Sequence, residues 1–438
     1  MNTATTPTSP GPDSPVKEPK KPSLLSIMGP GLITGASDDD PSGIATYSQA
    51  GAQFGFNMAW LMVFSWPLMC AIQEISARIG RVTGKGVAGN LKAHYPRSVL
   101  AAIVALLLIA NTINLGADLG AMAAGLKLVI GGPMLAYVAG FGVLSVLLEV
   151  FVRYSRYVSI LKWLTLVLFA YVGVVFVVHV PWNTVAVQLI VPHVDWTPAY
   201  LTTVVAILGT TISPYLFFWQ AEEEVEEVKE RPGAVPLARA PRQAPGELKR
   251  IRIDTYLGMG FSNIVALFII LTTAATLHAH GVTDIQTSAQ AAEALRPIAG
   301  QATFVVFALG IVGTGLLAVP VLAGSAAYAV GEAFGWHVGL ARKFGRAKGF
   351  YTVIIVATFV GAVLNFTPID PIKALFWSAV INGVVAVPVM GMMMLLASRT
   401  KVMGRFKLTG PLKVVGWLAT FVMAVAAVGM IATMGSQG

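Results

Sequence analysis

The chain has 438 residues, of which 55% are hydrophobic and only 12% are charged, and its mean hydropathy is +0.72. Soluble domains carry roughly 25% charged residues, so this composition excludes an ordinary soluble globule and favours a membrane protein. The single cysteine, Cys70, excludes an internal disulfide, and no spacing of Cys and His residues indicates a zinc site.

The apolar segments predict an all-α integral membrane fold. Residues 1–23 are rich in Pro, Ser and Thr and are predicted to form a disordered cytoplasmic tail, whereas residues 24–438 are predicted to form one transmembrane domain. The segment 228–248, between the sixth and seventh spans, is rich in Pro, Ala and Arg and is predicted to be a flexible cytoplasmic linker. Because a bilayer core takes about 20 apolar residues per helix, the domain contains about eleven predicted spans, centred near 27–55, 58–80, 99–130, 134–152, 157–181, 200–221, 254–278, 301–331, 350–368, 372–397 and 412–434.

The net charge of +9 follows the predicted topology. With the N-terminus inside, 27 of the 30 Lys and Arg residues fall in the tail and in the loops on the cytoplasmic side. Only Lys127, Arg296 and Lys373 fall on the outer side, as the positive-inside rule requires. We therefore expect a multi-pass protein of the cell membrane with a cytoplasmic N-terminus and an external C-terminus. The basic charge needs no nucleic-acid partner.

The first predicted span carries the sequence SDDDPSG, Ser37–Gly43, in its middle. A charged side chain at bilayer depth is costly, so Asp38, Asp39 and Asp40 indicate an ion or substrate path. Pro41 removes a backbone donor and Gly43 loosens the helix, and carbonyl groups freed by such a break bind cations where they line a cavity. The alternative is a solvated loop between two short helices, but neither apolar flank is long enough to span alone.

The sixth predicted span is broken in the same way. It carries the sequence GTTISPY, Gly209–Tyr215, with Pro214 at mid-span. Pro214 by itself is equally compatible with a simple kink. Spans one and six, however, hold corresponding places in two five-helix halves, and broken helices at matching places are the sequence signature of an alternating-access binding site.

The stretch from Gly29 to Gly55 resembles the first helix of the Nramp divalent-metal transporters, whose signature there is Asp-Pro-Gly-Asn. The resemblance covers nearly the whole chain from about residue 24. It implies a LeuT-like fold of two inverted five-helix repeats with broken helices one and six, and it implies divalent metal transport. Further matches follow in order at Ser76–Gly80, Val82–Gly84, Asp118–Gly120, Leu295–Pro297, Phe307–Gly310, Leu322–Gly324 and Met403–Gly404.

This sequence departs from the family pattern at the site itself. The family's metal-binding aspartate falls on Asp40, but its asparagine falls on Gly43 and its sixth-helix methionine on Ser213. The carbonyl ligand three positions earlier falls on Thr210, and the histidine after the proline is Tyr215. The resemblance thus implies a metal site in which the thioether ligand is missing.

These substitutions change the kind of metal ion that the site is expected to favour. A thioether favours soft transition metals, whereas oxygen ligands suit Mg²⁺, Ca²⁺ and Mn²⁺. Three adjacent aspartates cannot all face one ion, so we expect Asp40 to bind it directly and one neighbour, with Asp39 and Asp38 as candidates, to hold a water or a second contact. Mg²⁺ fits because it keeps several waters and binds through one or two carboxylates. Mn²⁺ and Fe²⁺ also accept oxygen sites, and the family favours them, so the ion stays open.

Proton coupling is predicted to be weak or absent. The family's third-helix glutamate falls on Ala121, and the ninth span has no charge between Tyr351 and Asn365, where the family carries basic residues tied to proton movement. A relay needs titratable groups leading away from the site, and Asp118 is the main candidate left, with Glu74 as the other. We therefore predict facilitated transport driven by the membrane potential.

Two further polar residues are candidates for the pathway. Asn382 in the tenth span either contributes a polar group to the pathway or forms an interhelical hydrogen bond. Glu223 lies in the acidic run after the sixth span, which is either an acidic mouth that attracts cations or a solvated helix end that offsets the basic linker.

Other classes of function fit less well. A sodium-coupled symporter of an amino acid or another small organic solute is the main alternative on the same fold, but three aspartates in the first break would repel a substrate carboxylate. A sensor would carry a large soluble output domain, which we do not find. The sequence contains no set of nucleophile and base and no cofactor loop, so we expect neither an enzyme nor a cofactor. The lipid bilayer and the transported metal ion are the expected partners, with no protein partner evident.

Overall fold

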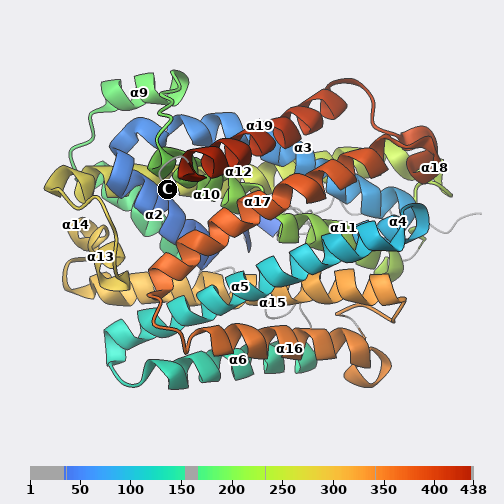
Figure 1. The fold of residues 1–438 in the computed structure, drawn as a ribbon, viewed down its shortest axis with the longest axis horizontal. Helices are drawn as coiled ribbons and strands as arrows, with labels where there is room; N and C mark the ends of the chain where they lie inside the picture. The colour runs from blue at the N-terminus through green and yellow to red at the C-terminus, as the bar shows by residue number, and fades with distance from the viewer. Residues whose placement is uncertain (1–33, 36, 153–165, 232, 341, 436–438) are drawn as a thin grey trace, which may run out of the picture.

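The computed structural model describes residues 34–435 except 36, 153–165, 232 and 341. In these residues every regular element is a helix (Figure 1). The helices are α2 Pro41–Phe54, α3 Trp60–Thr83, α4 Val87–His94, α5 Arg97–Ile130, α6 Met134–Phe151, α8 Phe169–Val177, α9 Trp182–Ile190, α10 Pro198–Thr211, α11 Pro214–Glu230, α12 Ala244–Thr276, α13 Ser288–Glu293, α14 Arg296–Ala299, α15 Thr303–Phe334, α16 Lys348–Leu364, α17 Pro371–Ser398, α18 Thr400–Met403 and α19 Gly410–Gly435.

Each predicted span coincides with at least one of these helices. By length and apolar composition, seven helical segments of the described chain qualify as spans, or eight when the bent pair of α2 and α3 is counted as one. That pair turns through 108° between its halves, so the first two predicted spans follow each other around a sharp corner. The helices α8 and α16 are shorter apolar helices. The predicted tail at 1–23 and the first part of the fifth span lie outside the described residues.

The long helices run side by side in the bundle (Figure 1). Helix α5 packs against α15, α17 and α16, while α2 packs against α12 and α11 packs against α3. Glycine allows the closest approaches, as membrane helix interfaces require. A Cβ atom on Gly209 of α10 would collide with the backbone of Ala379 and Gly383 on α17. The end of α10, where the sixth span is interrupted, is therefore held tightly against α17.

The segment between α11 and α12, where a flexible linker is predicted over 228–248, makes contacts with α3. Leu237 is buried, and its N–H group donates to the carbonyl of Arg81 at 3.1 Å. Arg81 itself is buried, and its guanidinium donates to Val235 O at 2.9 Å. The end of the segment is already helical because α12 begins at Ala244. The Pro- and Arg-rich composition predicts a polar segment, but it does not reveal that a buried arginine on α3 holds that segment in place.

Candidate functional site

The first break places Asp40 at the beginning of α2. Asp40 is the N-cap residue, with φ −72° and ψ 170°, and its Oδ1 accepts from Gly43 N at 2.7 Å and from Ser42 Oγ at 2.7 Å. Pro41 follows at the first helical position, where a missing N–H group costs nothing. The sequence Asp-Pro-Ser-Gly is therefore the buried start of a helix. Gly43, predicted as a metal contact, contributes its N–H to the carboxylate and has no side chain to offer.

The second oxygen of Asp40 faces α5 and α11. Asp40 Oδ2 accepts from Asn114 Nδ2 at 3.1 Å and from Tyr215 Oη at 3.3 Å. The amide oxygen of Asn114 accepts in turn from Ser378 Oγ at 2.6 Å. Asp40 is only 2% exposed, and all four of these partners are neutral. Burial among neutral partners in a medium of low dielectric destabilises the negative charge of this carboxylate, and a bound cation would stabilise that charge.

The two preceding aspartates face another helix. Ser262 Oγ on α12 lies 2.5 Å from Asp38 Oδ2 and 3.0 Å from Asp39 Oδ1. A hydroxyl has one hydrogen and can donate to only one of them at a time, and Asp38 Oδ1 has no hydrogen-bond partner among the described residues. The three adjacent aspartates therefore face different helices. Asp38 and Asp39 are directed toward α12, and Asp40 is directed toward α5 and α11.

The second break separates α10 from α11 by two residues, Ile212 and Ser213. Pro214 has no N–H group, so the carbonyl of Thr210, four residues earlier, loses its helical donor. Ser213 Oγ replaces that donor, at 2.7 Å from Thr210 O and 2.7 Å from Gly209 O. Thr210 Oγ1 lies 2.9 Å from Tyr47 Oη on α2. Both hydroxyls of this break are thus engaged by protein groups rather than directed at Asp40.

Two further sequence candidates lie on the facing helices α5 and α17. Asp118 follows Asn114 by one turn of α5, and Asn382 follows Ser378 by one turn of α17. Both are fully buried, and within the described part of the chain neither Asp118 oxygen nor either amide atom of Asn382 has a hydrogen-bond partner. Because α5 packs against α17, these side chains extend the polar region that begins at Asn114 and Ser378.

Glu223 lies away from both breaks. It follows Pro214 by nine residues of α11, which corresponds to about 14 Å along the helix. Its neighbours in the acidic run are mostly paired with basic residues: Glu224 Oε2 lies 2.6 Å from Arg250 Nη2, and Glu226 Oε1 lies 3.1 Å from Lys229 Nζ. This pairing favours the interpretation of the run as a charged helix end.

The described residues contain no group of three or more His, Cys, Asp or Glu side chains that could hold a metal ion. A cation at Asp40 would therefore bind one carboxylate together with neutral oxygens. Asn114 is suited to this because its amide presents nitrogen to Asp40 in the present orientation and would present oxygen after a 180° rotation.

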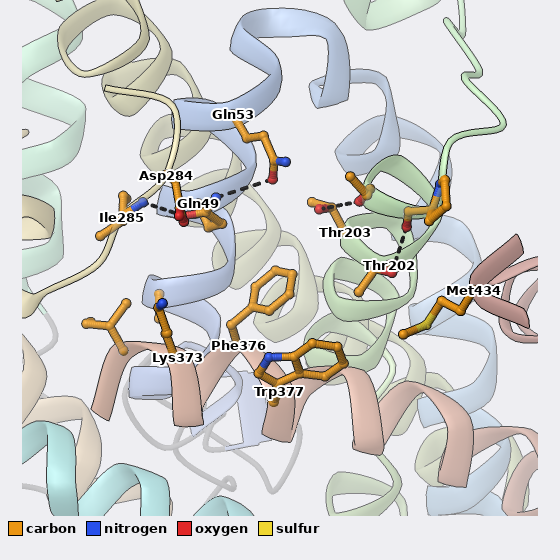
Figure 2. Close-up of a pocket in the computed structure, with 14 residues that line it drawn as sticks. Gln49, Gln53, Thr202, Thr203, Asp284, Ile285, Lys373, Phe376, Trp377 and Met434 are labelled. Atoms are coloured by element: carbon orange, nitrogen blue, oxygen red, sulfur yellow. Dashed lines mark hydrogen bonds between the residues drawn. The ribbon is translucent and has the colours of Figure 1, made fainter. Parts of the chain in front are cut away.

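A cavity of about 520 Å³ opens beside the C-terminal half of α2 (Figure 2). It lies between α2, α10 and α17, the helices that approach the two breaks. Gln49 of α2 connects its wall to the loop after α12, because its Oε1 accepts from Ile285 N at 2.9 Å. The labelled lining residues are Gln49, Gln53, Thr202, Thr203, Asp284, Ile285, Lys373, Phe376, Trp377 and Met434.

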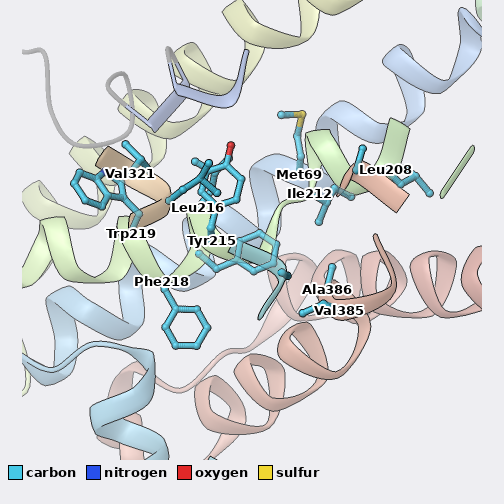
Figure 3. Packing of buried hydrophobic residues seen from close by; sticks show 14 of the residues in the cluster. Met69, Leu208, Ile212, Tyr215, Leu216, Phe218, Trp219, Val321, Val385 and Ala386 are labelled. Carbon is cyan, nitrogen blue, oxygen red and sulfur yellow. The ribbon is translucent and has the colours of Figure 1, made fainter. Parts of the chain in front are cut away.

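Buried side chains pack around the second break (Figure 3). Tyr215, Phe218 and Trp219 of α11 are buried there, and Val321 of α15 packs in the same cluster. Thr34, before the first break, donates to Gln220 Oε1 of α11 at 2.5 Å. The second break is therefore closely packed by apolar and aromatic side chains.

Sequence reasoning missed Tyr47, Asn114, Ser262 and Ser378. One signal was present: Asn111, Asn114 and Asp118 follow one another at spacings of three and four residues in an apolar span, which places them on one face of a helix. Ser262 and Ser378 gave no comparable signal, because single serines are common in membrane helices.

Comparisons with known proteins bear on the whole chain. Residues 31–433 match the family model described as Nramp, natural resistance-associated macrophage protein-like. The divalent metal cation transporter MntH of Klebsiella pneumoniae (strain 342) is 28% identical over 405 residues, which cover 90% of this chain and 91% of that protein.

Solved structures show the same fold. The manganese transporter of Eremococcus coleocola matches with a TM-score of 0.71 at 18% identity, over 97% of this chain and 90% of that one. Mhp1, a nucleobase-cation-symport-1 family transporter, matches with a TM-score of 0.54 at 13% identity, over 93% of each chain. These likenesses confirm the predicted all-α membrane fold with LeuT-like inverted repeats and interrupted first and sixth helices.

Proposed function

The chain belongs to the Nramp family, and from this premise we propose that it carries divalent metal cations across the cell membrane by alternating access. The observation that supports this most directly is Asp40, a buried carboxylate between two helix breaks whose four described partners are all neutral. The MntH relatives are named divalent metal cation transporters. The metal is the cargo, and no resident cofactor takes part.

In the proposed binding step the ion contacts Asp40 Oδ2, the oxygen that now accepts from Asn114 and Tyr215. Rotation of the Asn114 amide supplies a second oxygen, and the Tyr215 hydroxyl oxygen a third. The Thr210 carbonyl is a further candidate once Ser213 releases it. Asp39 and Asp38 add negative charge at the same break, which attracts the cation without direct contact.

This ligand set favours a hard cation. Carboxylate, amide and hydroxyl oxygens suit Mg²⁺ and Mn²⁺, and Fe²⁺ also accepts them. Position 213, where the family carries its thioether, holds a serine whose hydroxyl bonds to two carbonyls of the preceding helix, α10. We therefore propose an oxygen-rich site for Mn²⁺, Fe²⁺ or Mg²⁺ that gives soft ions no sulfur ligand.

The breaks also supply the hinges that alternating access needs. Helix α11 is held to α3, because Gln73 Nε2 donates to Leu216 O at 3.0 Å and Ser76 Oγ donates to Phe217 O. Helix α2 packs along α12. We propose that these two pairs stay fixed while the segment before Asp40 and α10 rotate about the breaks, so that the ion is exposed first to the cavity beside α2 and then to the other face.

Proton coupling is proposed to be weak or absent. Helix α16 carries no ionisable side chain after Tyr351, and Asp118 is the main titratable group beside the site that is not at a break. The membrane potential then drives uptake. Each charge moved inward contributes about 2.3 kcal/mol per 100 mV, so a divalent ion gains roughly twice that.

Uptake into proteoliposomes tests the proposal. Mn²⁺, Fe²⁺, Mg²⁺, Ca²⁺ and Cd²⁺ are offered outside, a potassium gradient with valinomycin sets the potential, and an internal pH dye reports protons. We expect potential-driven uptake of the hard ions with little acidification. Absence of divalent uptake, together with sodium-driven uptake of an organic solute, would instead establish the symporter alternative.

The proposed orientation has a separate test. We place the N-terminus in the cytoplasm and the C-terminus outside, from the distribution of Lys and Arg. A cysteine introduced at Gln437 in a Cys70→Ser background should react with a membrane-impermeant maleimide added to intact cells. Labelling only after the cells are opened would mean that one span has been miscounted.

A further inference from the structure

An apolar groove runs along the outside of the bundle, and it shares no lining residue with the cavity beside α2. It has a volume of about 580 Å³, within the range of about 300–1,000 Å³ that is typical of ligand sites. Helices α5, α15 and α16, which form it, lie side by side (Figure 1). Its lining is apolar except for two threonines and comprises Leu108, Ile109, Thr112, Ile113, Val330, Trp336, Gly349, Thr352, Val353, Val356, Ala357, Val360 and Leu364.

The groove opens toward the membrane. Ile109 on α5 is 58% exposed and Val356 on α16 is 52% exposed, and α5 is one of the membrane-spanning helices. The lining on α16 extends from Gly349 to Leu364, which is about 22 Å at 1.5 Å per residue. One leaflet of the hydrocarbon core is about 15 Å thick. The groove is therefore long enough to hold an extended acyl chain of one leaflet.

One end of the groove has the features of a membrane interface. Trp336 lines that end, packs against Gly349 and stacks on Phe334 with ring centroids 5.0 Å apart. Exposed aromatic residues of this kind mark the level of the lipid headgroups. A hydrophobic chain that lies in the groove would thus place its headgroup beside Trp336.

The same end carries unneutralised positive charge. Lys343 and Arg346 lie in the short connection before α16, Lys348 is the first residue of α16, and all three are exposed. Within the described residues none of them takes part in an ion pair. Lys348 immediately precedes Gly349, which lines the groove.

We propose that this groove is a binding site for an anionic phospholipid, with one acyl chain between α5 and α16 and the phosphate at Lys343, Arg346 and Lys348. Basic residues beside a membrane attract anionic headgroups, and an arginine binds phosphate through paired hydrogen bonds. A neutral phospholipid offers the same acyl chain but no net charge to match the three cations. A second copy of this chain packed symmetrically on the groove would bring three like charges against these three, which is unfavourable.

Quenching by brominated lipids tests the proposal on the full-length protein. The chain has nine tryptophans, so the signal of Trp336 is the difference between wild type and the Trp336→Phe variant. Nanodiscs of phosphatidylcholine receive increasing fractions of dibrominated phosphatidylglycerol or, in parallel, dibrominated phosphatidylcholine. We expect Trp336 to reach half-quenching at a lower fraction of the anionic lipid, by about fivefold for each basic residue that reaches the phosphate.

Two pairs of variants separate the headgroup contact from the chain contact. Lys343→Gln, Arg346→Gln and Lys348→Gln together should remove the preference for the anionic lipid, whereas Lys401→Gln, Arg405→Gln and Lys407→Gln, at a basic loop away from the groove, should leave it unchanged. Val356→Phe should fill the groove and weaken quenching by both lipids, and Val363→Phe, on the same helix outside the groove, should not.

Equal half-quenching fractions for the two lipids in the wild type would overturn the proposal and leave only ordinary annular lipid. Protection of Trp336 from both lipids, together with a dimer in solution, would overturn it in favour of a second copy. If the triple variant fails to elute as a single species, Lys348→Gln alone is used, and it must still reduce the preference. These outcomes are independent of metal transport because no readout involves a metal ion.

Discussion

The two helix breaks share a design and differ in what they offer a cation. Each is followed by a proline at the first position of the next helix, Pro41 in α2 and Pro214 in α11. At the first break stands a buried carboxylate with partners from three helices, whereas at the second stand hydroxyls that bond mainly to carbonyls of α10. We therefore expect the first break to bind the charge of the cation through its carboxylate. The second break would contribute a hinge and backbone oxygens.

A proline leaves the carbonyl four residues before it without a helical donor, and the two breaks satisfy that carbonyl differently. At the second break Ser213 Oγ, next to the proline, takes the place of the donor at 2.7 Å from Thr210 O. At the first break the Tyr215 hydroxyl, from the other break, lies 3.4 Å from Ser37 O. Tyr215 thus connects the two breaks, because it also contacts Asp40.

The largest effect is expected from the first break. Asp40→Asn should reduce divalent uptake to the level of empty liposomes, because it removes the one carboxylate directed toward α5 and α11. Asparagine caps a helix as well as aspartate does, so α2 should remain intact. Uptake of ⁵⁴Mn²⁺ measures the effect, and Asp39→Asn is the matched control with a smaller loss. Wild-type rates in Asp40→Asn would show that the ion binds elsewhere.

The next largest effect tests whether Asp40 acts with α5. Asn114→Ala removes a hydrogen bond to a charged group and the proposed amide ligand, so the KM for Mn²⁺ should rise by about 10- to 100-fold. Asn111→Ala is the control on the same helix, since the Asn111 amide donates to Leu322 O at 2.9 Å rather than to the site. An equal rise in KM for both variants would mean a general loosening of α5.

These residues show which features of the site could be predicted from the sequence and which could not. The spans, the two breaks and the family follow from hydropathy, proline positions and motif matches, because these are local properties of the chain. Asn114 and Ser378 are 264 residues apart and meet only through the packing of α5 against α17. Asp38 and Asp39 face a different helix from Asp40 because of the way the chain turns before α2. No local pattern contains that information.

Ser262 supplies a smaller test of that division. Ser262→Ala removes the hydroxyl that lies between Asp38 and Asp39, and a net hydrogen bond contributes about 1 kcal/mol, so uptake should fall by no more than about fivefold. The thermal midpoint should fall as well, because the two carboxylates lose their donor. The uptake assay and a melting curve measure the two effects. A loss of uptake as complete as that of Asp40→Asn would contradict a purely supporting role for Ser262.

The smallest effect is expected at the second break, where Ser213→Met restores the sulfur that the family carries. The substitution releases the Thr210 carbonyl from the serine hydroxyl and adds a thioether, so Cd²⁺ should gain affinity relative to Mn²⁺ by a factor of about three. Ser213→Leu is the matched control, because leucine releases the same carbonyl with a similar volume but no sulfur. Calorimetry on the two variants isolates the sulfur from the carbonyl. If Met and Leu give the same ratio of Cd²⁺ to Mn²⁺ affinity, position 213 does not line the site. The cation would then lie closer to Asp40 and α5, and the second break would serve only as a hinge.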